Sequence, residues 1–311
     1  MRLLIITCMA FVVSPVFSQD LDPRAYIQVP VKSTTMITGF AYSHGGVVTD
    51  ATLPVQNISA DVQSFSVGVA HAFDLFGLSS QALIAVPYSL AQVTGDVNQQ
   101  ASRITRSGFG DMRLRLSVLF HGAPAATLAE MKKTPPSKTI LGASLNIVVP
   151  TGQFFSDKLI NLGTNRWSFR PELALSQRIR KRWTLDAYAG IWLFTNNASF
   201  YPGTSLRKQD PMTTFQTHFS YNINPQMWIA FDATFYTGGS SSVNGIYNDD
   251  RQSNARFGIT AVVPTGKLSS LKFSASTGAV VRVGQDFSTY SIGWQHSWIP
   301  GFQASKMKKS R

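Results

Sequence analysis

The sequence has 311 residues, of which 44% are hydrophobic and only 14% are charged, whereas soluble domains carry roughly 25% charged residues. Its mean hydropathy of +0.01 is too low for a helical membrane protein but suits a transmembrane barrel, in which half of each strand is polar. The net charge of +12 would allow nucleic-acid binding. However, apart from one cluster at the C-terminus, the basic residues are spread singly along the chain, so we expect no nucleic-acid partner.

Residues 1–18 have the pattern of a cleaved secretory signal, with Arg2, an apolar run from Leu3 and a small residue, Ser18, at the expected cut. The segment is too short to span a membrane as a helix, and no other run of 18 apolar residues follows. The single cysteine, Cys8, lies within it, so we expect the mature chain to lack disulfides and cysteine-bound metals. An exported chain without a helical span can enter a membrane only as a closed barrel, because lipid leaves unpaired backbone groups unsatisfied.

Twelve strand-like segments follow, and within most of them apolar and polar side chains alternate. We expect strands near residues 34–44, 61–75, 81–93, 109–121, 138–150, 166–179, 183–195, 212–223, 226–237, 253–263, 269–282 and 287–299. In the fourth, Met112, Leu114 and Leu116 alternate with Arg113 and Arg115. Successive side chains of a strand point to opposite faces, and an Arg facing lipid at the midplane costs roughly 2–4 kcal/mol. The apolar face is therefore expected to meet lipid and the charged face to line a lumen.

The connections between these segments support the same fold. Short turns near residues 77, 181, 225 and 266 nearly alternate with longer polar links at 45–60, 95–107, 152–165, 196–211 and 238–252, as in outer-membrane barrels. The link at 122–137 is an exception, in which residues 125–133 are expected to form a brief helix ended by Pro135 and Pro136. Three tryptophans of outward parity lie at expected strand ends, which is typical of aromatic girdles. They are Trp167, Trp183 and Trp298.

These patterns predict an all-β protein consisting of a single transmembrane antiparallel β-barrel of outer-membrane type with about 12 strands. We expect the barrel to occupy residues 19–302 and a basic C-terminal tail to occupy residues 303–311, where the cluster of Lys and Arg indicates a solvated segment. A soluble secreted β protein is the competing fold. Its exposed strands would carry charge on both faces, whereas here the outward parity of most strands is almost free of charge.

Four short motifs resemble those of a known family. They are PRAY at residues 23–26, GFGD at 108–111, NLGTNRWSF at 161–169 and TGG at 237–239. In combination they make the sequence similar, over nearly the whole mature chain, to the bacterial outer-membrane transporters grouped as "putative meta-pathway of phenol degradation" proteins. This resemblance implies a barrel in the outer membrane of a Gram-negative bacterium and a role in the uptake of aromatic or other small hydrophobic compounds. No catalytic residues come with it.

Charged residues of inward parity form the candidate site. They are Asp111, Arg113, Arg115, Arg166, Arg170, Glu172, Asp186, Asp232, Arg256, Lys272 and Arg282. In a water-filled pore they would set ion selectivity and favour anions, whereas in a narrow barrel they would pair across the lumen as a structural network. Four aromatic residues of the same parity could stack on an aromatic solute or simply fill the lumen. They are Tyr188, Trp192, Trp228 and Tyr236.

The expected function is an outer-membrane channel or transporter for small solutes, aromatic or anionic in kind. Its expected partners are outer-membrane lipid, the solute and the barrel-assembly machinery. The alternative is a closed structural or ligand-binding barrel without an open pore. An outer-membrane hydrolase is disfavoured, because none of the five histidines lies in a metal-binding or nucleophile-elbow motif. We therefore expect no catalytic residues, metal or cofactor.

Overall fold

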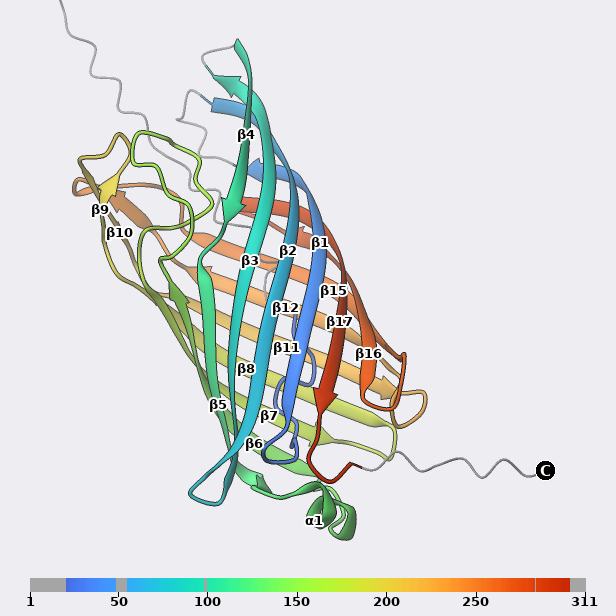
Figure 1. Cartoon of the computed structure of the whole chain (residues 1–311). Coiled ribbons are helices and arrows are strands. Elements are labelled where there is room, and N and C mark those ends of the chain that lie inside the picture. Colours follow the sequence, from blue (N-terminus) through green and yellow to red (C-terminus); the bar gives the residue numbers. More distant parts are fainter. Residues whose placement is uncertain (1–20, 49–54, 98–99, 283, 303–311) are drawn as a thin grey trace, which may run out of the picture.

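A computed structural model describes residues 21–48, 55–97, 100–282 and 284–302. Steeply tilted antiparallel strands close into one barrel (Figure 1). The wall segments are β1 (Thr34–Val48), β2 (Val55–Leu75), β3 (Leu78–Val97), β4 (Gln100–Phe109), β5 (Met112–Pro124), β6 (Thr139–Val149), β7 (Ser168–Arg178), β8 (Trp183–Phe194), β11 (Met212–Asn222), β12 (Trp228–Gly238), β15 (Gln252–Pro264), β16 (Ser269–Val280) and β17 (Gly284–Trp298). The expected signal at 1–18 and tail at 303–311 lie outside the described residues.

The barrel closes between its first and last strands, β1 and β17, which pair from Thr34↔Trp298 onward. β4 and β5 both pair with β3, β4 along its second half and β5 along its first. They are consecutive parts of one wall strand. The thirteen wall segments therefore occupy twelve positions, which confirms the expected architecture and strand count.

The region around β4 differs from the sequence-based prediction, which placed a loop at 95–107 and a strand at 109–121. β3 and β4 instead continue as a long hairpin, which projects at this end of the wall together with the start of β2 (Figure 1). The alternation is interrupted at Gly110 and Asp111, since Phe109 and Leu116 both face outward although an odd number of steps separates them. β4 was missed because its residues carry polar side chains on both faces, as expected above the lipid.

Side-chain exposure along the wall follows the predicted parity. Val67, Leu173 and Phe231 are more than half exposed on the outer face, while the residues beside Leu173 and Phe231 are buried and either small or acidic. The three girdle tryptophans lie at the strand ends as expected, with Trp183 and Trp298 at one rim and Trp167 just before β7 at the other. An apolar belt between two aromatic girdles is the outer surface that a lipid bilayer requires.

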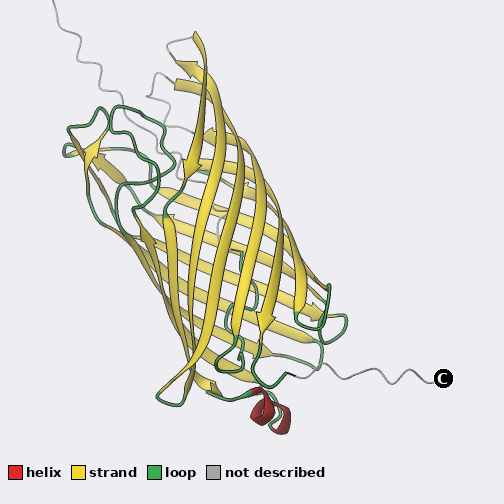
Figure 2. Cartoon of the chain, in the orientation of Figure 1, coloured by secondary structure: helices red, strands yellow, loops and turns green. Residues whose placement is uncertain are grey.

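The two ends of the barrel differ in their connections (Figure 2). One end carries short turns and the helix α1 (Leu128–Lys133), which confirms the expected brief helix and begins at a capping box of Thr127 and Glu130. The other end carries a small sheet of β9 (Asn197–Phe200), β10 (Ser205–Gln209), β13 (Ser241–Val243) and β14 (Ile246–Tyr247), where the sequence predicted loops only. Short turns face the periplasm in outer-membrane barrels, so the α1 end is the periplasmic end.

No helix in the described parts of the chain is long and apolar enough to cross a membrane.

Candidate functional site

The periplasmic half of the lumen is filled by residues 21–33, which we call the inner segment. It enters from the rim, where the Gln28 side-chain amide donates to the Pro124 carbonyl at 2.6 Å and the Val31 N–H donates to the Ala126 carbonyl at 2.9 Å. From there it runs into the barrel, where Tyr26 is 1% exposed. The sequence predicted no role for this segment, because it has no strand or helix periodicity and makes its contacts with distant residues.

Tyr26 is the buried anchor of the inner segment. Its hydroxyl donates to Glu172 Oε1 at 2.8 Å and lies 2.7 Å from the Ser144 hydroxyl. The Arg115 guanidinium lies 4.7 Å from the Tyr26 ring centroid, a favourable cation–π arrangement. The carboxylate of Glu172 also contacts Arg170 Nε at 3.5 Å, so one buried acid holds both the anchor and a wall arginine.

Ion pairs fix the tip of the inner segment. Asp22 bridges two wall strands, because one carboxylate oxygen accepts from Lys272 at 2.8 Å and the other lies 3.5 Å from Arg115. The Arg24 N–H donates to Asp186 at 3.2 Å. Candidate charges of β5, β8 and β16 are therefore used to hold the segment, as in a structural network across the lumen.

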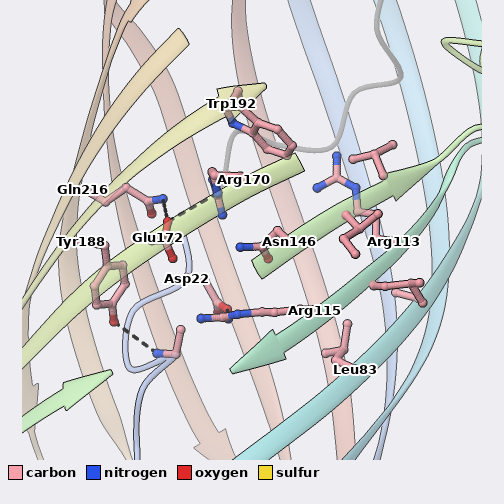
Figure 3. Close-up of a pocket in the computed structure, with 15 residues that line it drawn as sticks. Asp22, Leu83, Arg113, Arg115, Asn146, Arg170, Glu172, Tyr188, Trp192 and Gln216 are labelled. Atoms are coloured by element: carbon pink, nitrogen blue, oxygen red, sulfur yellow. Dashed lines mark hydrogen bonds and ion pairs between the residues drawn. The ribbon is translucent and has the colours of Figure 1, made fainter. Parts of the chain in front are cut away.

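Above the inner segment lies a cavity of about 160 Å³, which we call the inner cavity (Figure 3). Its wall includes Arg113 and Arg115 on one side, with Arg170, Trp192 and Tyr188 on the other. The Arg170 guanidinium lies 5.0 Å from the Trp192 ring centroid. A cavity of roughly 150 Å³ admits a benzene ring, so the inner cavity has room for one small aromatic molecule.

The inner cavity unites only part of the candidate site. Among its fifteen lining residues are six of the candidate charges and aromatics together with Asp22, Asn146 and Gln216, which the sequence did not single out. The candidates are Arg113, Arg115, Arg170, Glu172, Tyr188 and Trp192. The amide of Gln216 donates to Glu172 Oε2 at 3.4 Å. Its inward parity beside His218 was visible in the sequence, but only the barrel geometry brings it level with Glu172.

Asp232 belongs to a separate buried network on β11, β12 and β15. One of its oxygens lies 2.7 Å from His218 Nδ1, and the other accepts from the Thr260 hydroxyl at 2.7 Å. Both Asp232 and His218 are fully buried. The network joins neighbouring wall strands and does not reach the inner cavity. Trp228 is equally removed, because its ring packs against the Arg24 guanidinium at 4.6 Å.

The other candidates lie toward the extracellular end. The Arg166 guanidinium lies 4.5 Å from the Phe194 ring centroid and donates to Gln209 at 2.5 Å. Arg256 donates to the Phe287 carbonyl at 2.7 Å, and Tyr236 is buried on β12. Arg282 pairs at 2.7 Å with Asp249 in an exposed loop. None of these four lines the inner cavity.

Asp111 holds the loop at residues 150–167. Its carboxylate accepts from the Gly152 N–H at 2.9 Å, from the Thr164 N–H at 2.8 Å and from the Thr164 hydroxyl at 2.6 Å. The same loop places Ile160 and Leu162 in a buried apolar cluster with β2, β3 and β17. We call this the upper cluster. Its other buried members are Ala60, Val62, Ala91, Val93 and Phe287. The only sequence signal for it was the group of Leu159, Ile160 and Leu162 within a polar link.

No group of three or more His, Cys, Asp and Glu side chains in the described parts of the chain is arranged to hold a metal ion.

Comparisons with known proteins agree with the barrel. The family model described as "Putative MetA-pathway of phenol degradation" matches residues 31–295. An outer membrane channel from Pseudomonas putida F1 has a similar crystal structure, with a TM-score of 0.78 and 20% identity over 90% of this chain and 100% of that chain. The transport unit of the autotransporter AIDA-I from Escherichia coli is also similar, with a TM-score of 0.52 and 10% identity over 91% of this chain and 94% of that one. A search of curated proteins found no match. Likeness at these identities shows an outer-membrane β-barrel fold.

Proposed function

The chain belongs to the family described as "Putative MetA-pathway of phenol degradation", and from this membership and the geometry of its lumen we propose that it is an outer-membrane channel for small aromatic and anionic solutes. The inner cavity supports this function most directly. It lies in the lumen of a barrel whose outer face suits lipid, and it has the volume of a single aromatic ring. The proposal includes export by the signal at 1–18 and insertion by the barrel-assembly machinery.

The lining of the inner cavity favours an aromatic acid. Three guanidinium groups face two carboxylates, those of Asp22 and Glu172, so the lining carries net positive charge. Arginine recognises carboxylates through paired N–H donors, and the Trp192 ring offers a stacking face. A small aromatic carboxylate matches both features, whereas a neutral phenol uses only the second.

Passage through the barrel requires two obstructions to move. The inner segment lies below the inner cavity, and the upper cluster lies toward the extracellular end. The same observation supports the second candidate function, a closed barrel that binds its ligand without releasing it to the periplasm. A channel conducts solute when reconstituted, whereas a closed barrel does not.

The experiment is solute uptake into liposomes that contain the refolded protein, with benzoate and phenol compared in parallel. For the unaltered protein we expect uptake of both and a preference for benzoate. Arg113→Gln should lower that preference by about tenfold, which corresponds to about 1.4 kcal/mol. Arg166→Gln is the matched control, because Arg166 was also predicted to face the lumen but lies outside the inner cavity.

Two results would overturn the proposal. If folded protein takes up neither solute, the barrel is closed. If Arg113→Gln and Arg166→Gln change the preference equally, or neither changes it, the inner cavity does not select the solute.

A further inference from the structure

A second cavity, of about 220 Å³, opens at the periplasmic mouth between α1, the inner segment and the periplasmic ends of β6, β7, β8 and β11. We call it the mouth cavity. Its twelve lining residues include three cations, Arg24, Lys138 and Arg178, and no carboxylate. This composition is unlike that of the inner cavity, where two acids balance most of the positive charge.

The backbone holds two of these cations beside the mouth cavity. The Arg178 N–H donates to the Lys138 carbonyl at 2.7 Å, and the Arg178 guanidinium donates to the Pro136 carbonyl at 3.4 Å. The connection that follows α1 is therefore tied to the end of β7. A carbonyl partner leaves the positive charge of Arg178 uncompensated, because it supplies a hydrogen bond but no anion.

Arg24 contributes the third cation from the inner segment. Its Nη1 donates to Asn222 at 2.8 Å, whereas its Nε and Nη2 atoms are buried and have no hydrogen-bond partner. Buried polar atoms are normally satisfied, and a guanidinium with donors to spare suits an oxyanion. The nearby acid Asp186 accepts from the backbone of Arg24.

The surrounding rim is also basic, although its cations do not line the mouth cavity. Lys132 and Lys133 end α1, and the turn between β7 and β8 is Arg180, Lys181 and Arg182. The acid of α1, Glu130, accepts from Thr127 in the helix cap. A hollow lined by cations concentrates anions from solution.

We propose that the mouth cavity is a binding site for a small oxyanion, either the carboxylate of a single-ring acid or inorganic phosphate. The inner segment is the partition between the two cavities, because Ala25 lines the inner cavity while Arg24, Ile27 and Gln28 line the mouth cavity. If the proposed function holds, the mouth cavity receives an anionic solute that has passed the inner segment. Binding itself does not depend on transport.

The test is equilibrium dialysis of the whole protein in a neutral detergent, with benzoate and inorganic phosphate as probes. The variant K138Q/R178Q should weaken binding of at least one probe by tenfold or more. The matched control is K132Q/K133Q, which removes the same charge from the same rim but from residues that do not line the cavity. Its affinity should stay within twofold of the unaltered protein.

Further variants separate this site from the inner cavity and guard against misfolding. Ser137→Asp places an acid among the lining residues and should also abolish binding at the mouth cavity. Arg113→Gln should leave that binding in place. The proposal is overturned if Arg113→Gln removes all anion binding while K138Q/R178Q leaves it intact, a result that would still support the inner cavity. It is also overturned if K132Q/K133Q weakens binding as much as K138Q/R178Q does.

Discussion

The two halves of the lumen are filled by different segments of the chain, which are held by different contacts. In the periplasmic half, the inner segment is held by ion pairs and hydrogen bonds, with Asp22, Arg24 and Tyr26 each bound to wall residues far away in the sequence. In the extracellular half, loop residues Ile160 and Leu162 pack on apolar wall side chains. The inner segment depends mainly on polar contacts, whereas the loop combines apolar packing with the donors that it supplies to the buried Asp111.

This difference bears on which obstruction can move. Drawing out the inner segment takes one donor from each of two buried acids, Glu172 and Asp186, and an unmet buried polar group costs about 1–3 kcal/mol, more when it is charged. The ion pairs of Asp22 add less, because its side chain is 53% exposed. Withdrawing the loop at residues 150–167 exposes apolar side chains, at about 25 cal/mol per Å². It also takes from the buried Asp111 the donors of Gly152 and Thr164. Moving either obstruction therefore takes hydrogen-bond donors from a buried carboxylate, so we expect neither half to open freely.

The largest effect is expected for Glu172→Ala. The change removes the acceptor of the Tyr26 hydroxyl and the carboxylate partner of Arg170 in a buried site, and breaking a buried pair costs about 3–5 kcal/mol. The measurement is urea unfolding of the barrel in lipid vesicles. Asp157→Ala is the control, because Asp157 pairs with Lys158 at 2.9 Å on the exposed surface, where such pairs contribute about 0–1 kcal/mol. Equal losses in the two variants would show that the polar filling is not what holds the periplasmic half.

A smaller change in stability, but a clear change in channel conductance, is expected for I160A/L162A. Shortening both side chains should weaken docking of the loop by about 2–4 kcal/mol. This is low for truncating two buried side chains, because the loop can shift to fill part of the space that they leave. Single-channel conductance in planar bilayers should rise, and resistance of the barrel to urea should fall by less than in Glu172→Ala. Phe155→Ala, in the same loop but 45% exposed, should alter neither. Unchanged conductance in I160A/L162A would mean that the upper cluster does not obstruct the lumen.

The wall of the barrel was predictable because it depends on a period of two residues. Arg113 and Arg115 were placed in the lumen by parity alone, since the opposite assignment of faces would have brought their charges into lipid. Height along the barrel was not predictable in the same way. Arg166 and Arg170 share parity, but four residues of strand span about 13 Å. Only Arg170 reaches the inner cavity.

The filling of the lumen was not predictable from local patterns. Asp22 meets Lys272 across a sequence separation of 250 residues, and Tyr26 meets Glu172 across 146. No periodicity marks the inner segment, so only the closed barrel shows which wall residues it faces. The alternation of side chains therefore identified the inward charges but left open which of them pair and which line a cavity.

The last prediction compares two acids that have nearly the same donors. Asp111 accepts from the N–H and hydroxyl of Thr164 and from the Gly152 N–H while 1% exposed. Glu130 accepts from the N–H and hydroxyl of Thr127 at 2.7 and 2.8 Å on the exposed rim. Asp111→Asn should destabilise the docked loop by about 1–3 kcal/mol, because buried donors lose their acceptors. Limited proteolysis within residues 150–167 would measure this loss.

Glu130→Gln should leave the barrel and the loop unaffected and change only α1. The backbone N–H and hydroxyl of Thr127 lower the pKa of Glu130 below its ordinary value. The charged acid therefore stabilises α1 above the ordinary pKa of glutamate, and this contribution is lost as the pH falls through the lowered value. The amide chemical shifts of α1, followed by NMR from neutral to acidic pH, should change with pH in the unaltered protein. This pH-dependent change should be absent in Glu130→Gln. If Glu130→Gln exposed the loop at residues 150–167 to protease as much as Asp111→Asn does, the burial of Asp111 would not explain its effect on the loop.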